Sequence, residues 1–461
     1  MTLIKSISGI RGTIGGKPGV GLSPLDVVKY TAAYGEWLLR KKNRERAMVI
    51  TGRDARPSGE MVNRLMTGTL NAMGIDVRDI GLAATPTVEL AVREEKADGG
   101  IILTASHNPV EWNALKLLDN KGEFLSADDG ARILKIAENE GYSFVTYEKI
   151  GKVTSKTGYN EKHIEMLLAL PDIDIDKIRE REFTVVIDCV NSVGGLILPE
   201  LLYKLGVKKV IGLYMEPSGL FPHNPEPLPE NLTALEQAVL ENNADLGFVV
   251  DPDVDRLAIV SEDGTCFNEE YTLVACADYI LSRRKGNTVS NMSSTRALRD
   301  VTEKYGAVWY ASAVGEVNVV AKMKEVNAVI GGEGNGGVIY PRFHYGRDAL
   351  AGIALFLSLL ANKGGTCSGL RSTYPDYLIS KNRIDLSYGL DADKVLGRIN
   401  EKMHENVVST EDGLLIENER GWVNIRKSNT EPILRIYSEG RTRQDADTMA
   451  QEIIKIVKKT N

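Results

Sequence analysis

Residues 100–109 are Gly-Ile-Ile-Leu-Thr-Ala-Ser-His-Asn-Pro, an apolar run followed directly by a polar one. The apolar half predicts a buried strand over Gly100–Thr104, and the polar half predicts a loop at its end. Upstream, apolar residues recur at helical spacing from Met61 to Met73, and Gly74 is placed to end that helix. Because strand and helix patterns alternate in this way, we predict a mostly parallel sheet with helices on both faces.

The same alternation continues along the chain and then changes. We predict three similar mixed α/β domains over residues 1–150, 151–256 and 257–370, and an α+β domain over residues 371–461. In the last of these, two helical patterns bracket three strand patterns, so the order of elements differs from the first three. A chain of 461 residues exceeds one typical core, which agrees with several domains.

The composition excludes several classes of function. A net charge of -7 argues against a nucleic-acid-binding protein, because phosphate contacts need a surplus of Lys and Arg. The longest apolar run, Ala349–Ala361, is too short to cross a bilayer and predicts a buried helix. The four cysteines show no CxxC pairing, and the N-terminus has no targeting signal. We therefore expect a cytoplasmic protein that binds neither nucleic acid nor membranes.

An acidic loop follows the predicted strand Leu246–Val250. Asp251, Asp253 and Asp255 alternate along it, so their oxygens can turn toward a common point. Three such charges repel strongly unless a cation neutralises them, and oxygen ligands select Mg²⁺ or Ca²⁺. An EF-hand does not explain the loop, since Arg256 stands where that motif needs glycine for its sharp turn.

The loop after Gly100–Thr104 offers a nucleophile. Ser106 lies beside His107 on a tight connection, where a hydroxyl can act as a covalent carrier of phosphate. Taken by itself, the pair is also typical of a turn rich in hydrogen-bonding side chains. No aspartate stands in a protease-like order, so a hydrolase triad is not predicted.

A glycine-rich stretch over residues 331–337 contains a literal GxGxxG. A dinucleotide site would need a helix to follow, whereas Val338–Pro341 has an extended pattern that ends in proline. We interpret the stretch as a flexible loop from which Glu333 and Asn335 project.

A fourth polar loop lies in the last predicted domain. Residues 426–432 are Arg-Lys-Ser-Asn-Thr-Glu-Pro, and Arg435 follows. Two guanidinium groups with hydroxyls and backbone N–H groups form a good receptor for a phosphate dianion. A solvated surface turn of the same composition is the alternative.

Together these motifs resemble the α-D-phosphohexomutase family, which comprises phosphomannomutases, phosphoglucomutases and phosphoglucosamine mutases. The match covers the whole chain in family order. The matching segments are SGIRG (8–12), GRDAR (52–56), TASHNP (104–109), DPDVDR (251–256), GGEGNGG (331–337) and RKSNTEP (426–432). The resemblance implies four domains in a heart-shaped arrangement around a central cleft.

The resemblance also implies a role for each matching residue. Ser106 would be the phosphoserine, and its phosphate would be the fourth ligand of a Mg²⁺ held by the three aspartates. The other implied roles are charge stabilisation by Arg256, handling of the hydroxyl proton by Lys116 with Arg11, and phosphate binding by Arg426, Ser428, Asn429, Thr430 and Arg435. We place His107 with the catalytic residues, and Gly315 with the sugar-binding pair Glu333 and Asn335.

The implied reaction moves a phosphoryl group between two positions of a hexose phosphate through a hexose bisphosphate, which also acts as activator. The family commonly has Asn-Gly before the lysine, and here Asn113-Ala114 takes that place. In the sugar loop, Asn335 and Gly337 replace a common serine and histidine. This form resembles the archaeal-type phosphoglucosamine mutase branch. We therefore expect interconversion of glucosamine 6- and 1-phosphate, with mannose or glucose phosphate as alternatives, by a monomer or homodimer.

Two rivals come from other classes. A haloacid-dehalogenase-type phosphatase would use Asp251 as nucleophile, but its motif wants Thr or Val where Asp255 stands, and it gives Ser106 no role. A catalytically silent sugar-phosphate-binding protein would not need the full set of chemical groups that the motifs supply.

Overall fold

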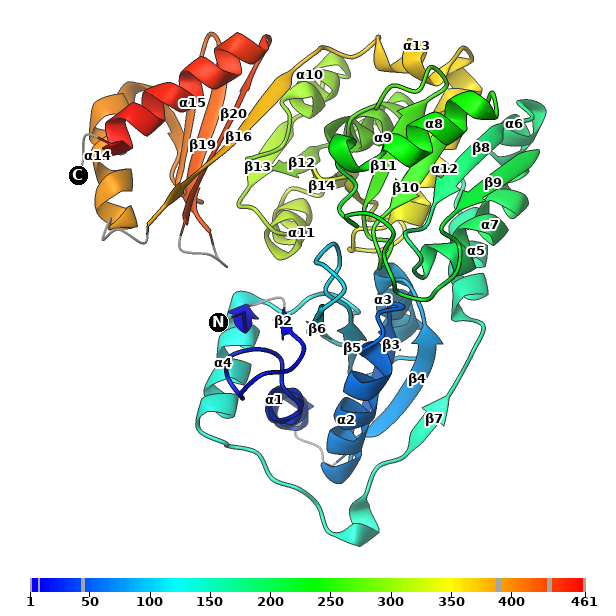
Figure 1. Cartoon of the computed structure of the whole chain (residues 1–461), viewed down its shortest axis with the longest axis vertical. Coiled ribbons are helices and arrows are strands. Elements are labelled where there is room, and N and C mark those ends of the chain that lie inside the picture. The colour runs from blue at the N-terminus through cyan, green and yellow to red at the C-terminus, as the bar shows by residue number, and fades with distance from the viewer. Residues whose placement is uncertain (1, 7–8, 43–45, 387–390, 429–432, 459–461) are drawn as a thin grey trace. The chain divides into compact units, whose positions relative to one another are not determined.

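The computed structural model describes residues 2–6, 9–42, 46–386, 391–428 and 433–458. The chain forms two compact units, one of Met1–Thr272 with Gly336–Leu370 and one of Leu273–Asn335 with Arg371–Asn461. Figure 1 labels many of the helices and strands of both units.

A seven-stranded sheet dominates the N-terminal part of the first unit, in the order β1-β2-β6-β5-β3-β4-β7. Strands β4, β3, β5 and β7 form its parallel half, and β1, β2 and β6 its antiparallel half. The strand bounds are Ile4–Ser6, Gly9–Thr13, Met48–Arg53, Asp76–Leu82, Gly99–Leu103, Trp112–Leu118 and Val153–Ser155 for β1 to β7.

The antiparallel half has a simple cause in the length of one connection. Residues 104–111, which contain Ser106, are all that separates β5 from β6. A parallel crossover needs a dozen residues or more, so this segment can only turn back as a hairpin. The predicted mixed α/β architecture is thus confirmed, and the serine loop is the tight turn between a parallel and an antiparallel strand.

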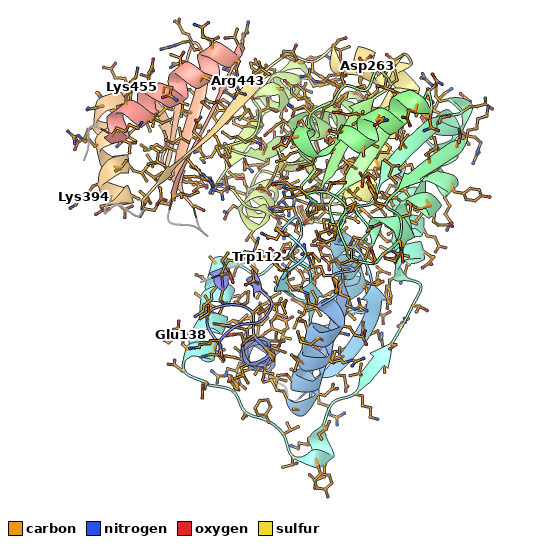
Figure 2. The ribbon with its side chains drawn as sticks, in the orientation of Figure 1. Trp112, Glu138, Asp263, Lys394, Arg443 and Lys455 are labelled. Atoms are coloured by element: carbon orange, nitrogen blue, oxygen red, sulfur yellow. The ribbon has the colours of Figure 1, made fainter. Side chains whose placement is uncertain are left out.

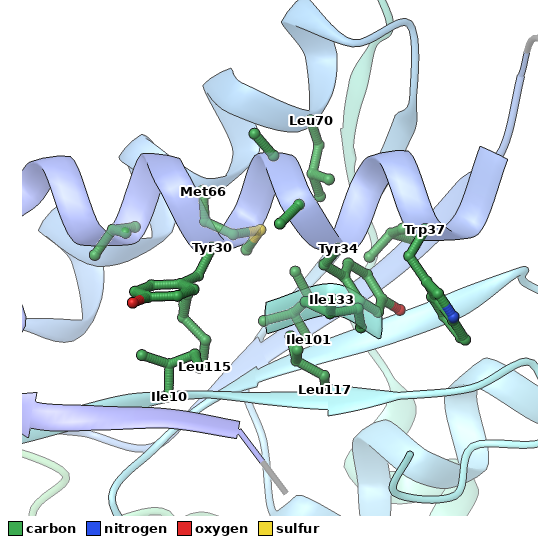
Figure 3. Packing of buried hydrophobic residues seen from close by; sticks show 14 of the residues in the cluster. Ile10, Tyr30, Tyr34, Trp37, Met66, Leu70, Ile101, Leu115, Leu117 and Ile133 are labelled. Carbon is green, nitrogen blue, oxygen red and sulfur yellow. The ribbon is translucent and has the colours of Figure 1, made fainter. Parts of the chain in front are cut away.

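Helices cover both faces of this sheet. Figure 3 shows Tyr30 and Tyr34 of α1 and Met66 of α2 packed over Ile101 and Leu117 of the strands. Each such fully buried apolar side chain stabilises the fold by about 1.5–3 kcal/mol relative to an exposed one. The helices of this part are α1 Pro24–Lys42, α2 Gly59–Ala72, α3 Thr85–Glu94, α4 Ala127–Glu138 and α5 Tyr159–Leu168, with a short η1 at Tyr147–Lys149.

A second sheet of the first unit has the order β11-β10-β8-β9. Strands β8, β9 and β10 run parallel, and β11 pairs antiparallel with β10 because residues 251–256 are too short for a crossover. The bounds are Thr184–Asp188, Lys209–Leu213, Leu246–Val250 and Leu257–Ser261 for β8 to β11, with helices α6 Ile175–Glu180, α7 Gly194–Leu205, α8 Thr233–Glu241 and η2 Pro229–Asn231. Helix α12, Ala349–Lys363, is buried from Ala349 to Ala361, as predicted.

The second unit contains a parallel arrangement of β12 with β13 and β14, and a five-stranded sheet in the order β16-β20-β19-β18-β17. Its last part packs α14 and α15 on the five-stranded sheet through residues such as Ile399, Ile425 and Ile453, which confirms the predicted α+β domain. The bounds are β12 Thr288–Asn291, α10 Ala297–Lys304, β13 Trp309–Ser312, α11 Glu316–Glu325, β14 Ile330–Glu333, β16 Leu378–Asp385, α14 Ala392–Met403, η3 His404–Asn406, β17 Val407–Ser409, β18 Leu414–Asn418, β19 Gly421–Lys427, β20 Ile433–Gly440 and α15 Arg443–Lys458. Three elements at the junctions of the units complete the order, α9 Glu269–Arg283, β15 Gly337–Ile339 and α13 Cys367–Arg371.

The last strand of the first sheet, β7, ends at Ser155, and the last strand of the second sheet, β11, ends at Ser261. The domain boundaries inferred from the sequence stay predictions. Charged side chains such as Glu138 on α4, Asp263 in the turn after β11 and Lys455 on α15 are exposed (Figure 2). Among the described residues, no helix combines the length and the apolar character needed to cross a membrane.

The core beneath α2 gives a first test. Leu70 is fully buried in this core, whereas Leu25 on α1 is 65% exposed. Replacing Leu70 by alanine should leave a cavity and lower the free energy of unfolding of the N-terminal part by about 2–5 kcal/mol. Urea denaturation followed by circular dichroism measures the change, with Leu25→Ala as the matched control. Equal losses in the two variants would contradict the packing described above.

Candidate active site

The serine loop is held by a buried arginine. The side chain of Arg56 is fully buried and pairs with Asp54 through Nε at 2.9 Å. Its terminal nitrogens donate to the backbone carbonyl oxygens of Ser106, Asn108, Pro109 and Trp112. One planar guanidinium with several fixed donors can bind carbonyls on both sides of a turn at once. Arg56 therefore fixes the path of the backbone through the loop.

Ser106 itself lies in a strained conformation. Its φ of 49° is in the left-handed region, which costs of order 1–3 kcal/mol for a residue with a Cβ. The Thr104 hydroxyl accepts from the Ser106 backbone N–H at 2.9 Å and donates to Asp54 at 2.7 Å. The Ser106 hydroxyl donates to Oδ2 of Asp251 at 2.6 Å. The loop thus aims a buried hydroxyl at the first aspartate of the acidic loop.

The three aspartates converge, as the sequence predicted. Asp251, Asp253 and Asp255 are fully buried, and each offers a carboxylate oxygen within 4.8 Å of the others. Oδ1 of Asp253 and Oδ1 of Asp255 are buried and have no hydrogen-bond partner among the described residues. A buried, unpartnered carboxylate oxygen is costly, and a divalent cation is the ligand that hard oxygen donors bind best. The donor set therefore fits a metal ion.

Three cations surround this acidic cluster. Lys116 on β6 donates to Oδ2 of Asp253 at 2.7 Å and approaches Asp255 at 3.5 Å. Arg347 donates to Oδ2 of Asp255 at 2.7 Å, and Nε of Arg256 lies 3.8 Å from Oδ1 of the same carboxylate. The sequence did not single out Arg347, which lies directly before the buried helix α12.

The cations and the burial shift the ionisation of the cluster in opposite directions. Burial raises the pKa of Asp251 well above its usual value, and the charges of Asp255 and Asp253 raise it further. Burial acts in the same sense on Asp255, but Arg347, Lys116 and Arg256 outweigh it and lower the pKa of Asp255. Burial also acts to lower the pKa of Lys116, yet Asp253 and Asp255 raise it, so its ammonium holds its proton.

Arg11 and His107 lie beside the serine loop. Arg11 on β2 stands opposite Ala114 of β6, two residues before Lys116 on the same strand, and donates to the side chain of Asn108 at 3.2 Å. Burial lowers the pKa of His107 well below its usual value, and the charges of Arg256 and Arg11 add to the effect, so the imidazole is neutral.

Glu226, which the sequence did not single out, lies near two of these predicted residues. Its Oε1 is 3.9 Å from Nε2 of His107 and 3.5 Å from Nη1 of Arg256. It comes from the connection between β9 and η2, where its charge alone gives no sign of a partner.

The predicted sugar-binding residues lie together in the second unit. Glu333 ends β14 and is 4% exposed. Its Oε1 accepts from the backbone N–H of Gly315 at 3.0 Å and from Nδ2 of Asn291 at 2.8 Å. Asn335 approaches Oε2 of Glu333 at 3.5 Å. The structure therefore brings Glu333, Asn335 and Gly315 together and adds Asn291, which the sequence did not single out.

The predicted phosphate clamp is a hairpin. Arg426 on β19 and Arg435 on β20 are directly opposite partners, and Ser428 closes the hairpin with a bond from its N–H to the carbonyl of Ile433 at 2.9 Å. Nε of Arg426 is buried and has no hydrogen-bond partner among the described residues. Burial lowers the pKa of Arg426; the Asp412 carboxylate opposes this, and Arg435 adds to it. Asn429 and Thr430 lie outside the described residues.

Models of one protein family match the chain in four consecutive segments. They are described as phosphoglucomutase/phosphomannomutase, alpha/beta/alpha domains I, II and III and C-terminal domain, and they match residues 3–143, 161–264, 268–377 and 390–456. The chain belongs to this family. It is a phosphohexomutase, an isomerase that moves a phosphoryl group within a hexose phosphate, as the motifs predicted.

Relatives and solved structures agree with this assignment. The chain is 34% identical over 440 residues to a phosphoglucomutase/phosphomannomutase of Thermococcus kodakarensis, covering 95% of each chain. It is 34% identical over 458 residues to a probable phosphoglucosamine mutase of Pyrococcus horikoshii, covering 98% of this chain and 97% of the other. A crystal structure of a phosphoglucomutase/phosphomannomutase family protein from Burkholderia thailandensis superposes with a TM-score of 0.84 at 25% identity, covering 98% of this chain and 96% of that one.

Arg56 allows a test of how the serine loop is held. Replacing it by lysine keeps the positive charge but removes the planar set of donors that binds the carbonyl oxygens of the loop. We expect the mutase kcat to fall by about tenfold or more, since charged hydrogen bonds are worth about 1.5–3 kcal/mol each. The matched control is Arg64→Lys on α2, where the side chain is 77% exposed. An unchanged kcat in Arg56→Lys would show that the loop does not depend on this side chain.

Proposed function

We propose that this phosphohexomutase carries its phosphoryl group on Ser106 and uses a Mg²⁺ bound by Asp251, Asp253 and Asp255. The observation that carries the proposal is the 2.6 Å hydrogen bond from the Ser106 hydroxyl to Asp251. It joins a buried nucleophile to a buried cluster of three carboxylates. A phosphate on Ser106 would add oxygen ligands beside that cluster.

Two features of the cluster support the metal. One oxygen each of Asp253 and Asp255 lacks a hydrogen-bond partner and is a hard donor, and among the described residues the cluster contains no sulfur or imidazole ligand. A Mg²⁺ held by Asp251, Asp253 and Asp255 would supply positive charge that stabilises the transferring phosphoryl group.

The residues of the first unit have separate tasks in the transfer. The bond between Ser106 Oγ and phosphorus breaks as a bond forms from a sugar oxygen to phosphorus. The sugar hydroxyl loses its proton, and Ser106 Oγ gains one to become a free hydroxyl. We assign the handling of the sugar proton to Lys116, assisted by Arg11, and the stabilisation of charge on the phosphoryl group to Arg256. Because the Lys116 ammonium holds a proton, it has to release that proton before it can accept the one from the sugar. Arg347 and Lys116 already offset the carboxylates by direct ion pairs at 2.7 Å. His107 is neutral and adds a hydrogen-bonding group beside Ser106 without adding charge.

The residues of the second unit supply recognition. Glu333 and Asn335, with Gly315, are proposed to bind the sugar hydroxyls, and Arg426, Ser428, Asn429, Thr430 and Arg435 to bind the phosphate that is not being transferred. The product of the first transfer is a hexose bisphosphate, and it must bind in either orientation for its other phosphate to return to Ser106. A hexose bisphosphate can therefore also prime an enzyme that has lost its phosphate.

The proposed substrate is glucosamine phosphate, interconverted between the 6- and 1-phosphate. The amide of Asn335 offers both a donor and an acceptor, so it can satisfy an amine or a hydroxyl. The Pyrococcus horikoshii relative is named a probable phosphoglucosamine mutase, which agrees, whereas the equally similar Thermococcus kodakarensis relative is named for glucose and mannose. The cytoplasmic location and the oligomeric state stay predictions.

The phosphoserine can be tested by chemistry. After labelling with ³²P-labelled substrate, the label should survive hydroxylamine, because a phosphate on a serine hydroxyl resists it and an aspartyl phosphate does not. Ser106→Ala should take up no label and lose turnover by orders of magnitude, while Ser155→Ala at an exposed position should behave as the wild type. Release of the label by hydroxylamine would favour Asp251 as the nucleophile.

The sugar can be tested with three substrates. We expect kcat/KM to be highest for glucosamine 1-phosphate and detectable for glucose and mannose 1-phosphate. One substituent typically changes transition-state binding by only about 1–3 kcal/mol when no polar group of the site is left unpaired. The measurement is steady-state kinetics with a trace of the matching bisphosphate. A preference for glucose or mannose phosphate would overturn the substrate and leave the mutase mechanism in place.

A further inference from the structure

Two consecutive backbone N–H groups join the sugar loop to the C-terminal domain. The N–H of Gly315 donates to Oε1 of Glu333 at 3.0 Å. The N–H of the preceding residue, Val314, donates to Oδ2 of Asp412 at 2.9 Å. Gly315 has a φ of 111°, which residues with a Cβ rarely adopt, so this backbone is fixed in an unusual path. Two successive peptide groups therefore each bind one carboxylate.

A second connection runs in parallel through side chains. Asn291 donates from Nδ2 to Glu333 at 2.8 Å, and Ser293, two residues later, donates to Oδ1 of Asn424 at 2.8 Å. Asn424 is 1% exposed, and its Nδ2 approaches the carbonyl oxygen of Asp412 at 3.4 Å. Glu333, Asn424 and Asp412 thus belong to one closed network, because both connections end at the same turn.

The same turn faces the phosphate clamp. Gly413, with a φ of 75°, packs so closely on β19 that a Cβ there would lie 2.0 Å from the carbonyl oxygen of Ile425. Ile425 directly precedes Arg426, whose charge the Asp412 carboxylate supports. Asn424 lies two residues before Arg426, so in an extended strand both side chains are on the same face.

We propose that Asp412 and Asn424 are positioning residues that couple Glu333 to Arg426, so that the sugar and the distal phosphate are recognised as one unit. Neither residue needs to touch the substrate. Asp412 accepts from the backbone N–H of Val314, next to Gly315, and offsets the positive charge of Arg426. Asn424 holds the loop of Asn291 and Ser293 against the strand that carries Arg426.

Coupling of Glu333 to Arg426 would meet a geometric requirement of the reaction. The bisphosphate must present either end to the same clamp while its ring contacts the same carboxylate. A fixed spacing between Glu333 and Arg426 meets this requirement, and a loosely connected pair does not. The inference rests on the roles proposed above for Glu333 and Arg426, so its test must distinguish failure of the coupling from failure of those roles.

A double-mutant cycle makes that distinction. The variants are Glu333→Gln, Asp412→Asn, Asp412→Ala and the double variants that combine Glu333→Gln with each, assayed by kcat and KM for the three hexose 1-phosphates. We expect Asp412→Ala to raise KM more than it lowers kcat and to reduce the ratio of kcat/KM between the preferred and the other sugars. In the double variants, the loss should be smaller than the product of the single losses by about fivefold or more.

The conservative variant separates the two tasks of the carboxylate. Asparagine keeps an acceptor for the Val314 N–H but removes the charge beside Arg426, so Asp412→Asn should raise KM while it retains the discrimination among sugars. The matched control is Glu411→Gln, an exposed neighbour in the same loop, which should behave as the wild type. Since Asp412→Asn preserves the shape of the turn, it carries the test even when Asp412→Ala does not fold.

Three outcomes would overturn the inference. If the loss in kcat/KM of each double variant equals the product of the losses of its two single variants, Asp412 is a structural turn residue without coupling. The roles of Glu333 and Arg426 then stand. If Asp412→Asn and Asp412→Ala both keep wild-type KM and sugar discrimination, the network has no effect on recognition. If Glu333→Gln itself has wild-type kinetics, the sugar-binding role fails together with the coupling.

Discussion

The charge balance around three buried carboxylates constrains the first unit more than any other interaction. Carboxylates about 5 Å apart repel by about 3–4 kcal/mol per pair even at an effective dielectric constant of about 20. Asp251, Asp253 and Asp255 are held at this range by a six-residue hairpin, so the repulsion has to be offset locally. Lys116 and Arg347 provide direct ion pairs. Because these cations come from β6 and from the start of α12, the positions of both elements depend on the acidic loop.

Short connections explain why the chemical groups stay where the strands place them. The serine loop spans residues 104–111, and the acidic loop spans residues 251–256. Each follows a buried strand and turns back too soon for a crossover helix. A short hairpin between buried strands has few backbone torsions left to vary, which suits catalytic groups that must be positioned within a fraction of an ångström. The φ of 49° at Ser106 is a strained conformation. Hydrogen bonds between the Ser106 backbone and the side chains of Arg56 and Thr104 stabilise it.

The sequence predicts those helices, strands and loops whose structure depends on residues close to them along the chain. The strand Leu246–Val250 has the predicted bounds, because an apolar run and the polar loop that follows it define the strand locally. The strand Trp112–Leu118 escaped prediction because buried Asn113 and Lys116 interrupt its apolar pattern. Lys116 is buried only because Asp253, 137 positions later, pairs with it. Arg347 was missed for the same reason, since its partner Asp255 lies 92 positions away. Long-range ion pairs leave no periodic signal in a sequence.

The acidic cluster of the first unit and the arginine pair of the second unit carry charge of opposite sign, which agrees with the ligands proposed for each. In the first, carboxylate oxygens of Asp253 and Asp255 lack hydrogen-bond partners among the described residues, so that cluster favours a cation. In the second, Arg426 and Arg435 stand directly opposite each other on neighbouring strands, an arrangement of like charges that destabilises a sheet. Burial disfavours the charge on Arg426 further, and Asp412 offsets only part of this cost. A phosphate dianion would satisfy both guanidinium groups at once. In the proposed role of the hairpin, binding of the distal phosphate would relieve part of the repulsion between Arg426 and Arg435.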